Sequence, residues 1–317
     1  MNILVIQNRM GIGDMVIFLP FIQAIANKYN SPVTLLIKAS TKAEEYTKNL
    51  NYIKKIIYLR RENKNDLHSG LSGFFNLKNE IKKYSFDKVF IFNSSLRYRL
   101  VCKIADIKDI YQYPLFKKKE QHIIRAAQKL LEMIDLRVVS NPQIEINENS
   151  IQIAIQKFKI LNSKMNILLG IGGSGPSKRI PADKFKKFIN LINKDHECNF
   201  YLATGKNEEE QIILKDILSS HKDICVALDN YTISEILPII KSCRISICND
   251  SSFSHLSAAL NIPTIVLMSD TPLIYGSYSP NMYPIVPDGI ENVSHNSRGK
   301  EKINPEKIYN KFKSIIS

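Results

Sequence analysis

Polar and charged residues whose side chains could take part in chemistry occur at three places along the chain, each directly after an apolar stretch. Asp14 follows two glycines in "NRMGIGDMVIFLPF", Lys178 and Arg179 end a glycine-rich stretch in "GIGGSGPSKRIPADKF", and Asp250 and His255 lie in "ICNDSSFSHLSAAL". A positioned carboxylate can take a proton from a reacting group, and two neighbouring cations can face a diphosphate. The sequence thus offers a candidate base and two candidate anion sites. Asp14 as a helix N-cap is the alternative interpretation of the first stretch.

The third stretch has the composition of a strand that runs directly into a helix. Asp250 is suited to cap a helix that begins near Ser251, and Ser251 and Ser252 offer hydroxyls and N–H groups at its first turn. His255 is expected one turn beyond Ser251, on the same face. Helix N-termini attract phosphate, so this junction is a predicted anion site, although a lone histidine is more often a structural residue.

The second stretch is a glycine-rich loop that matches no standard nucleotide motif well. Gly170, Gly172 and Gly175 fit G-x-G-x-x-G, but Pro176 follows the third glycine and the next helix is expected only after residue 181. A Walker A loop is absent. What remains is a loop containing Gly173 and Ser174 and ending in two cations, with a solvated basic turn as the alternative.

No D-x-D pair and no cluster with metal-ligand spacing occurs in the sequence. We therefore expect no metal and no cofactor, and phosphates neutralised by Lys178, Arg179 and helix dipoles.

The elements that must position these loops are strands alternating with helices. Strands are expected at 3–7, 33–37, 53–59, 88–92, 166–171, 199–204, 224–228, 244–249 and 264–268, and helices near 15–29, 42–50, 74–84, 95–105, 119–135, 182–194, 207–220, 233–242 and 252–260. Continuous apolar strands indicate burial on both faces, hence parallel sheets between helices. Residues 138–165 are the best linker candidate. The predicted class is α/β, with two doubly wound, Rossmann-like domains at 1–155 and 156–317 and ligands at the carboxyl ends of the strands.

Composition limits the class of protein. The chain has 317 residues, of which 44% are hydrophobic and 23% charged, as in soluble globular proteins. No secretory leader is visible, and the longest apolar stretch is too short to cross a bilayer, so a cytoplasmic location is expected. The five cysteines are scattered and odd in number, which favours buried free thiols.

The formal net charge of +14 is concentrated in the first half. Residues 1–155 hold 24 Lys and Arg against 14 Asp and Glu, whereas residues 156–317 hold 20 against 16. Such a chain could meet nucleic acid, an anionic membrane or an acidic substrate, or be basic without functional reason. No nucleic-acid recognition motif is visible, which weighs against the first of these.

With these three stretches the chain resembles glycosyltransferase family nine, the bacterial ADP-heptose:lipopolysaccharide heptosyltransferases. The segment "ILVIQNRMGIGDMVIFLPFIQAI" is similar to the family's opening strand, Gly-Asp turn and proline-bearing helix, and "LLGIGGSGPSKRIPADKFKKFINLI" to its lysine-bearing donor loop. The segment "ICNDSSFSHLSAALNIPTIVLMSDTPLIYGSYSP" resembles its Asn-Asp-Ser/Thr-Gly-x-x-His segment and the turn after it. The similarity extends in order over nearly the whole length.

The resemblance implies a GT-B fold, with the acceptor bound by the front domain and the nucleotide-sugar by the back domain. It implies that Asp14 is the general base and that the donor contacts include Gly13, Gly173, Ser174, Lys178, Arg179, Asp250, Ser251, Ser252 and His255. Two departures from the family pattern lie beside the implied donor site. Ser252 replaces the family's glycine, and Met268-Ser269-Asp270-Thr271 replaces its Gly-Pro-Thr-Asp turn.

The implied activity is inverting, metal-independent transfer of heptose from ADP-heptose to the inner core of lipopolysaccharide, by a single displacement. The acceptor is a lipid-linked acidic glycan at the inner face of the cytoplasmic membrane, where the protein would be peripheral. Basic residues could hold it electrostatically, above all Arg60, Arg61 and Lys64, and also Lys54, Lys55 and Lys117 to Lys119. The alternatives are a relative that uses another donor or glycan, a catalytically silent sugar-nucleotide binder and a nucleic-acid-binding protein.

Overall fold

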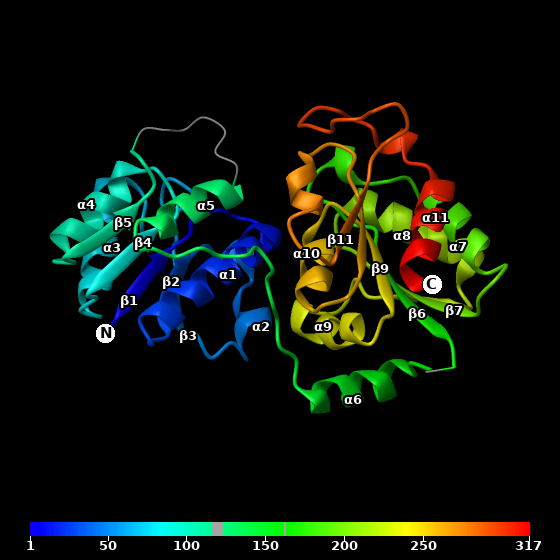
Figure 1. Cartoon of the computed structure of the whole chain (residues 1–317), viewed down its shortest axis with the longest axis horizontal. Helices are drawn as coiled ribbons and strands as arrows, with labels where there is room; N and C mark the ends of the chain where they lie inside the picture. The colour runs from blue at the N-terminus through cyan, green and yellow to red at the C-terminus, as the bar shows by residue number, and fades with distance from the viewer. Residues whose placement is uncertain (116–122, 162) are drawn as a thin grey trace. The chain divides into compact units, whose positions relative to one another are not determined.

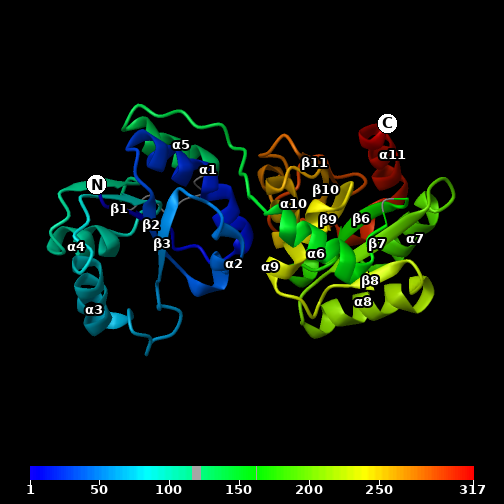
Figure 2. The ribbon, with the colours of Figure 1, turned by 90° about the horizontal axis from the view of Figure 1, so that it is seen from below.

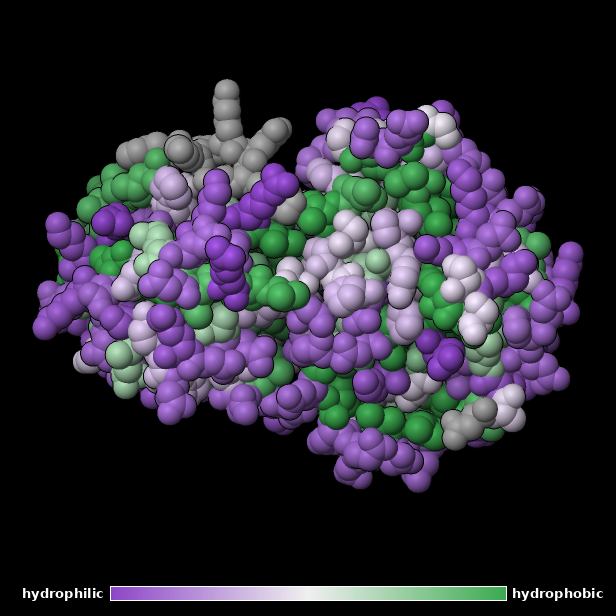
Figure 3. All heavy atoms as spheres, viewed as in Figure 1, coloured by the Kyte–Doolittle hydropathy of each residue, from purple (hydrophilic) through white to green (hydrophobic). Residues whose placement is uncertain are grey.

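The computed structural model describes residues 1–115, 123–161 and 163–317. The chain forms two compact units, Met1–Pro142 and Gln143–Ser317, each of them an α/β sandwich. Every strand pair in both sheets is parallel. The predicted class, two parallel sheets each enclosed by helices, is therefore confirmed. Hydrophilic residues cover most of each unit on the face that Figure 3 shows, with smaller hydrophobic areas between them.

Unit 1 has a five-stranded sheet of order β3-β2-β1-β4-β5. Its elements are β1 (Ile3–Ile6), α1 (Ile12–Lys28), β2 (Val33–Ile37), η1 (Ala39–Thr41), α2 (Glu44–Thr47), β3 (Ile53–Tyr58), α3 (Gly70–Lys82), β4 (Lys88–Ile91), α4 (Leu96–Ile104), β5 (Asp109–Gln112) and α5 (Ile123–Glu132). Helices α3 and α4 cover one face of the sheet and α1 and α5 the other (Figures 1 and 2). The central strands β1 and β2 are completely buried, as continuous apolar strands require.

Unit 2 has a six-stranded sheet of order β11-β10-β9-β6-β7-β8. Its elements are α6 (Glu148–Phe158), β6 (Met165–Gly170), η2 (Pro176–Lys178), α7 (Ala182–Ile192), β7 (Cys198–Ala203), α8 (Glu208–His221), β8 (Cys225–Ala227), α9 (Ile233–Lys241), β9 (Ile245–Asn249), α10 (Ser252–Ala259), β10 (Thr264–Leu267), η3 (Leu273–Gly276), β11 (Met282–Ile285), η4 (Lys300–Lys302) and α11 (Pro305–Ile316). Strand order reverses between β9 and β6, and the loops after both strands therefore meet at one edge of the sheet.

The segment expected to be a linker contains helix α6. This helix begins at the N-cap Asn147, whose side chain accepts a hydrogen bond from the Ser150 amide at 2.8 Å. It packs against α9, and the rings of Phe158 and Tyr231 meet edge to face. The division between the units accordingly falls between Pro142 and Gln143, before α6, and not at the expected position after residue 155.

All five cysteines are free and buried, as the sequence indicated. Burial raises the pKa of the Cys198 thiol to about 11 and that of Cys225 to about 12, so neither is a reactive thiolate at neutral pH. Within the described residues no helix is both long and apolar enough to cross a membrane.

Candidate functional site

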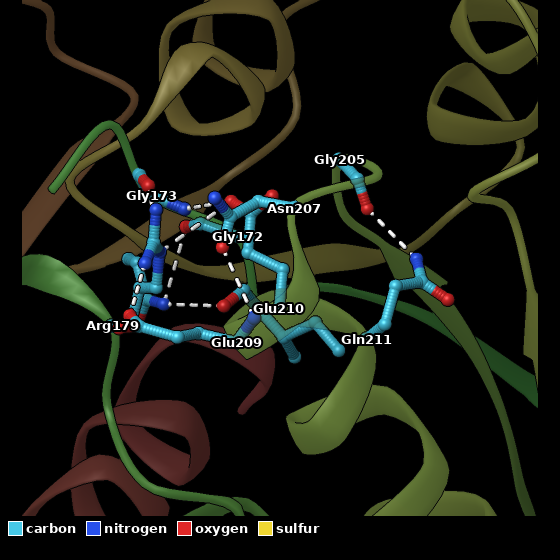
Figure 4. A network of polar contacts seen from close by, with 10 residues as sticks. Gly172, Gly173, Arg179, Gly205, Asn207, Glu209, Glu210 and Gln211 are labelled. Carbon is cyan, nitrogen blue, oxygen red and sulfur yellow. Dashed lines mark hydrogen bonds and ion pairs between the residues drawn. The ribbon is translucent and has the colours of Figure 1, made fainter. Parts of the chain in front are cut away.

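The loop after β6 is held in place by Arg179, which sequence reasoning assigned to a diphosphate. The Arg179 side chain is buried, and its Nε donates a hydrogen bond to the Gly173 carbonyl at 3.0 Å. Its Nη1 forms an ion pair with Glu209 at the start of α8 (Figure 4). The guanidinium therefore fastens the loop to the next strand-helix unit, and Lys178 is left as the cation of this loop that faces the site.

Glu210 is a second anchor of this loop, and it was not identified from the sequence. Its carboxylate is buried and accepts a hydrogen bond from the Gly173 amide at 2.8 Å (Figure 4). A Cβ at Gly205 would lie 2.5 Å from Glu210 Oε2, and one at Gly172 would lie 2.8 Å from Oε1. The glycines of both loops thus allow backbone to approach a buried carboxylate. Gly172, one of the three glycines of the G-x-G-x-x-G pattern, therefore has a structural role in this loop.

Lys178 and Asp250 form the centre of the site in unit 2. Lys178 Nζ donates to Asp250 Oδ2 at 2.6 Å, and the two side chains are 23% and 4% exposed. Burial acts to raise the Asp250 pKa, but the positive charge of Lys178 and the neighbouring His255 ring outweigh it and lower the pKa. Asp250 is therefore a buried carboxylate that stays ionised beside a partly exposed ammonium group.

Asp250 is not the cap of the following helix, contrary to the expectation from its position. The N-cap of α10 is Ser251, which makes no side-chain cap bond, and the Asp250 carboxylate faces Lys178 instead. The Ser251 hydroxyl is buried and has no hydrogen-bond partner in the described part of the chain, while Ser252 is half-buried at the first position of α10. The helix start consequently keeps unpaired donors, as an anion site requires.

His255 lies one turn into α10, where its ring packs on Tyr278. The two rings stack with centroids 5.6 Å apart, and His255 Nδ1 lies 2.9 Å from the Tyr278 hydroxyl. His255 Nε2 is 3.9 Å from Asp250 Oδ1. Burial raises the pKa of the Tyr278 hydroxyl, so this group is a neutral hydrogen-bond partner at all ordinary pH values. Tyr278 belongs to the site but was not identified from the sequence.

The turn that departs from the family pattern is bonded to the lysine loop. Ser269 Oγ donates to the Ser177 carbonyl at 2.8 Å, and Asp270 accepts from the Arg298 amide at 2.7 Å. Between these segments lies a cavity of about 400 Å³, lined by Pro176, Ser177, Asp270, Asn296, Arg298 and Lys300. Asp270 of this turn therefore forms part of the wall of a cavity that the lysine-bearing loop also lines through Pro176 and Ser177.

Asp14 lies in unit 1, in the first turn of α1. The N-cap of this helix is Gly11, so Asp14 is the third helical residue and does not cap the helix, while Gly13 is buried at the second position. The Asp14 side chain is 24% exposed, and its Oδ1 lies 3.2 Å from Arg9 Nη1. A carboxylate that is accessible and held by a single cation at the carboxyl end of β1 is suited to accept a proton.

Three of the basic residues expected to bind the acceptor lie on the loop between β3 and α3, whereas Lys54 and Lys55 lie on β3 itself. Arg60, Arg61 and Lys64 are all exposed there. Asp66 organises the loop by accepting the amides of residues 62 and 63, and Arg97 of α4 donates to the carbonyls at residues 68 and 70, each at 2.9 Å. Arg60 also lines a cavity of about 590 Å³ between β3 and α3. Lys117 to Lys119 lie outside the described residues.

Gly73 allows α3 to pack on this basic loop, which gives a test of how the loop is held. A Cβ there would lie 2.2 Å from the His68 carbonyl carbon, a backbone atom that cannot move alone. Gly73→Ala is expected to lower the free energy of unfolding by about 1–3 kcal/mol. Thermal unfolding measures this, with Gly175→Ala as the control because nothing lies within 4 Å of its Cβ. Equal melting temperatures for the two variants would contradict the packing argument.

Among the described residues, no group of three or more His, Cys, Asp or Glu side chains is arranged to hold a metal ion.

Comparison with known proteins finds one family. Residues 76–311 match the model described as glycosyltransferase family 9 (heptosyltransferase). A lipopolysaccharide heptosyltransferase 1 of Campylobacter coli is 29% identical over 157 residues, which are 47% of this chain and 45% of that protein. The chain thus spans less than two thirds of the curated relatives it matches first.

Two solved structures show the same fold over nearly their whole length. ADP-heptose lipopolysaccharide heptosyltransferase II of Escherichia coli has a TM-score of 0.76 at 16% identity, with 100% of this chain and 98% of that chain covered. The E. coli heptosyltransferase WaaC with ADP-2-deoxy-2-fluoro heptose has a TM-score of 0.70 at 13% identity, with both chains covered completely. The fold is that of the GT-B heptosyltransferases, as the motifs implied.

Proposed function

Because the chain belongs to glycosyltransferase family 9, the heptosyltransferase family, we propose that it transfers heptose from ADP-heptose to the inner core of lipopolysaccharide. The observation that carries the proposal is the ion pair of Lys178 with the buried Asp250 beside the start of α10. A partly exposed ammonium group next to unpaired helix donors is a site for a diphosphate. The family membership and the ADP-heptose analogue named with a relative of the same fold support this donor.

In the proposed reaction the donor diphosphate binds in unit 2. Lys178 and the first amides of α10 stabilise the negative charge that develops as the sugar leaves. Asp250 holds Lys178, while Arg179 and Glu210 hold the loop, so that the ammonium group is positioned before the donor arrives. His255, Ser252, Ser251, Ser174 and Gly173 are proposed as further donor contacts. No divalent metal is needed in this scheme.

Asp14 is the proposed general base. It would take the proton of an acceptor hydroxyl as that oxygen attacks the anomeric carbon, and the product would have inverted configuration. Arg60, Arg61 and Lys64 would attract the acidic, phosphorylated acceptor at the inner face of the cytoplasmic membrane. Gly13, beside Asp14 in the first turn of α1, is proposed as a further donor contact.

A donor screen tests the proposal. ADP-heptose is expected to raise the melting temperature, because a ligand at one hundred times its dissociation constant stabilises the folded state by about 2.7 kcal/mol. UDP-sugars and GDP-sugars are expected to have less effect, and only ADP-heptose should give glycosylated product. Stabilisation and turnover by another nucleotide-sugar would assign the chain a different donor. Product formation without stabilisation by any donor, or neither effect, would contradict the proposed site.

A further inference from the structure

Helices α3 and α4 run side by side in the same direction over one face of the unit 1 sheet. Their N-terminal ends are joined because Arg97 of α4 donates to the carbonyls at residues 68 and 70, at the start of α3. Their C-terminal ends are joined because Lys82 of α3 donates to Asp106, just after α4, at 2.6 Å. Figure 2 shows the two helices next to each other at the edge of unit 1. Their outward faces therefore form one surface.

This surface carries two parallel apolar stripes. On α3 the stripe is Leu71 and Phe75, which are 83% and 57% exposed; on α4 it is Leu96, Leu100 and Ile104, spaced four residues apart and each about 40% exposed. In the described part of the chain fourteen large hydrophobic side chains are exposed, and five of them lie on these two short helices. Exposed apolar residues scattered singly are normal, but stripes on neighbouring helices indicate a binding surface.

Cations accompany the apolar stripes, and acids are nearly absent. Lys78 and Lys82 follow Leu71 and Phe75 on the same face of α3. Arg99 and Lys103 are exposed between the apolar residues of α4. The only acidic residue within the two helices is Glu80, which turns away from this face and lies 2.9 Å from His68 Nε2.

The charge decides which partner fits. A symmetric contact between two copies would bring the same cations together, because the same patch must face itself. An anionic lipid surface, in contrast, complements the lysines and arginines while its acyl boundary accepts the apolar stripes. We propose that the outward face of α3 and α4 docks the protein on an anionic membrane. This docking face consists of Leu71, Phe75, Leu96, Leu100, Ile104, Lys78, Arg99 and Lys103. This inference rests on the proposed function, since it supplies the contact that a lipid-linked acceptor requires.

Vesicle co-sedimentation of the full chain tests the docking face. The wild-type protein is expected to bind vesicles of phosphatidylcholine mixed with phosphatidylglycerol, and to bind less as salt rises. The triple variant Leu71→Gln, Phe75→Gln, Leu100→Gln should bind at least about tenfold more weakly, because three apolar side chains no longer enter the interface. A second triple variant, Lys78→Gln, Arg99→Gln, Lys103→Gln, should bind the vesicles about fivefold more weakly for each cation that is removed.

The control is the double variant Val139→Gln, Ile212→Gln, whose side chains are 84% and 60% exposed but lie elsewhere. It should bind as the wild type does, and all variants should keep the wild-type melting temperature. No binding of the wild type to anionic vesicles, or equal binding by the triple variant, would overturn the docking face. The docking face would also be overturned if sedimentation velocity showed a wild-type dimer that the apolar triple variant does not form, because the face would then join two copies.

Transfer to a soluble acceptor without its lipid separates this inference from the proposed function. Both docking variants should transfer heptose to such an acceptor at the wild-type rate. A wild-type protein that binds vesicles through this face but transfers no heptose would contradict the proposed function and leave the docking face standing.

Discussion

Asp14→Asn is expected to lower turnover by about 10² to 10⁴ while leaving donor binding intact. Asparagine has the same shape as aspartate, but its amide cannot take a proton from the acceptor hydroxyl. The lost ion pair with Arg9 is partly exposed, and pairs of this kind contribute only about 0–1 kcal/mol to stability. The fold should therefore survive. Initial rates with ADP-heptose, together with the thermal shift caused by the donor, measure the two effects separately.

Asp109→Asn in the same unit is a matched control. Asp109 is a partly exposed carboxylate on β5 that pairs with Lys88, as Asp14 pairs with Arg9. This control removes a charge and an ion pair of the same kind from unit 1, away from the loop after β1, and should keep the wild-type rate. If Asp14→Asn also transferred heptose at the wild-type rate, Asp14 would not be the base. If it abolished the donor-induced shift instead, Asp14 would act in donor binding.

The sequence predicted every interior strand and the edge strands β3 and β8, but it missed the other two edge strands. Nine strands expected from apolar runs are present, and in the seven interior ones burial on both faces leaves a clear pattern. The edge strands β5 ("DIYQ") and β11 ("MYPI") were missed, since an edge strand is half exposed and can be short and polar. Helix α6 was missed because it buries only Ala154 and its composition resembles that of a linker.

The sequence indicated which loops form the candidate site, but not which side chains contact one another in it. Parallel strands place the loops after β6 and β9 at one edge of the sheet, so Lys178 and Asp250 could be expected near each other. The sequence could not show that Arg179 turns inward, because this depends on Glu209 and Glu210, some thirty residues later. Tyr278 reaches the site only through the packing of the segment that follows β10.

Lys178→Met is expected to destabilise the protein by about 3 kcal/mol and to abolish donor-induced stabilisation. Most of this loss of stability arises from Asp250, because its carboxylate is 4% exposed and would lose its nearest cation. Asp250→Asn should cost less, because Lys178 is 23% exposed and its ammonium group can reach water. The double variant Lys178→Met, Asp250→Asn should recover most of the stability lost in Lys178→Met. Melting temperatures of the four proteins measure the coupling.

The contribution of Asp250 to the pH dependence of stability should have opposite signs in the wild type and in Lys178→Met. In the wild type the Asp250 pKa is lowered, because Lys178 and His255 outweigh burial. Ionised Asp250 therefore contributes stability above its unfolded pKa of about 3.9, and this contribution is lost as pH falls through the folded value. Without Lys178, burial dominates and should raise the folded pKa. The contribution of Asp250 in Lys178→Met is then greatest at low pH and decreases as pH rises.

Lys186→Met provides the control for this pair. Lys186 forms a 2.8 Å ion pair with Asp216, but Asp216 is 47% exposed, so its carboxylate stays hydrated when the lysine is removed. Its loss should change stability by less than about 1 kcal/mol, with no change in pH dependence and with the donor shift retained. Equal destabilisation by Lys178→Met and Lys186→Met would mean that the buried Asp250 carboxylate loses no more stability without its cation than an exposed carboxylate does. A donor shift retained in Lys178→Met would remove the ammonium group from the proposed diphosphate site.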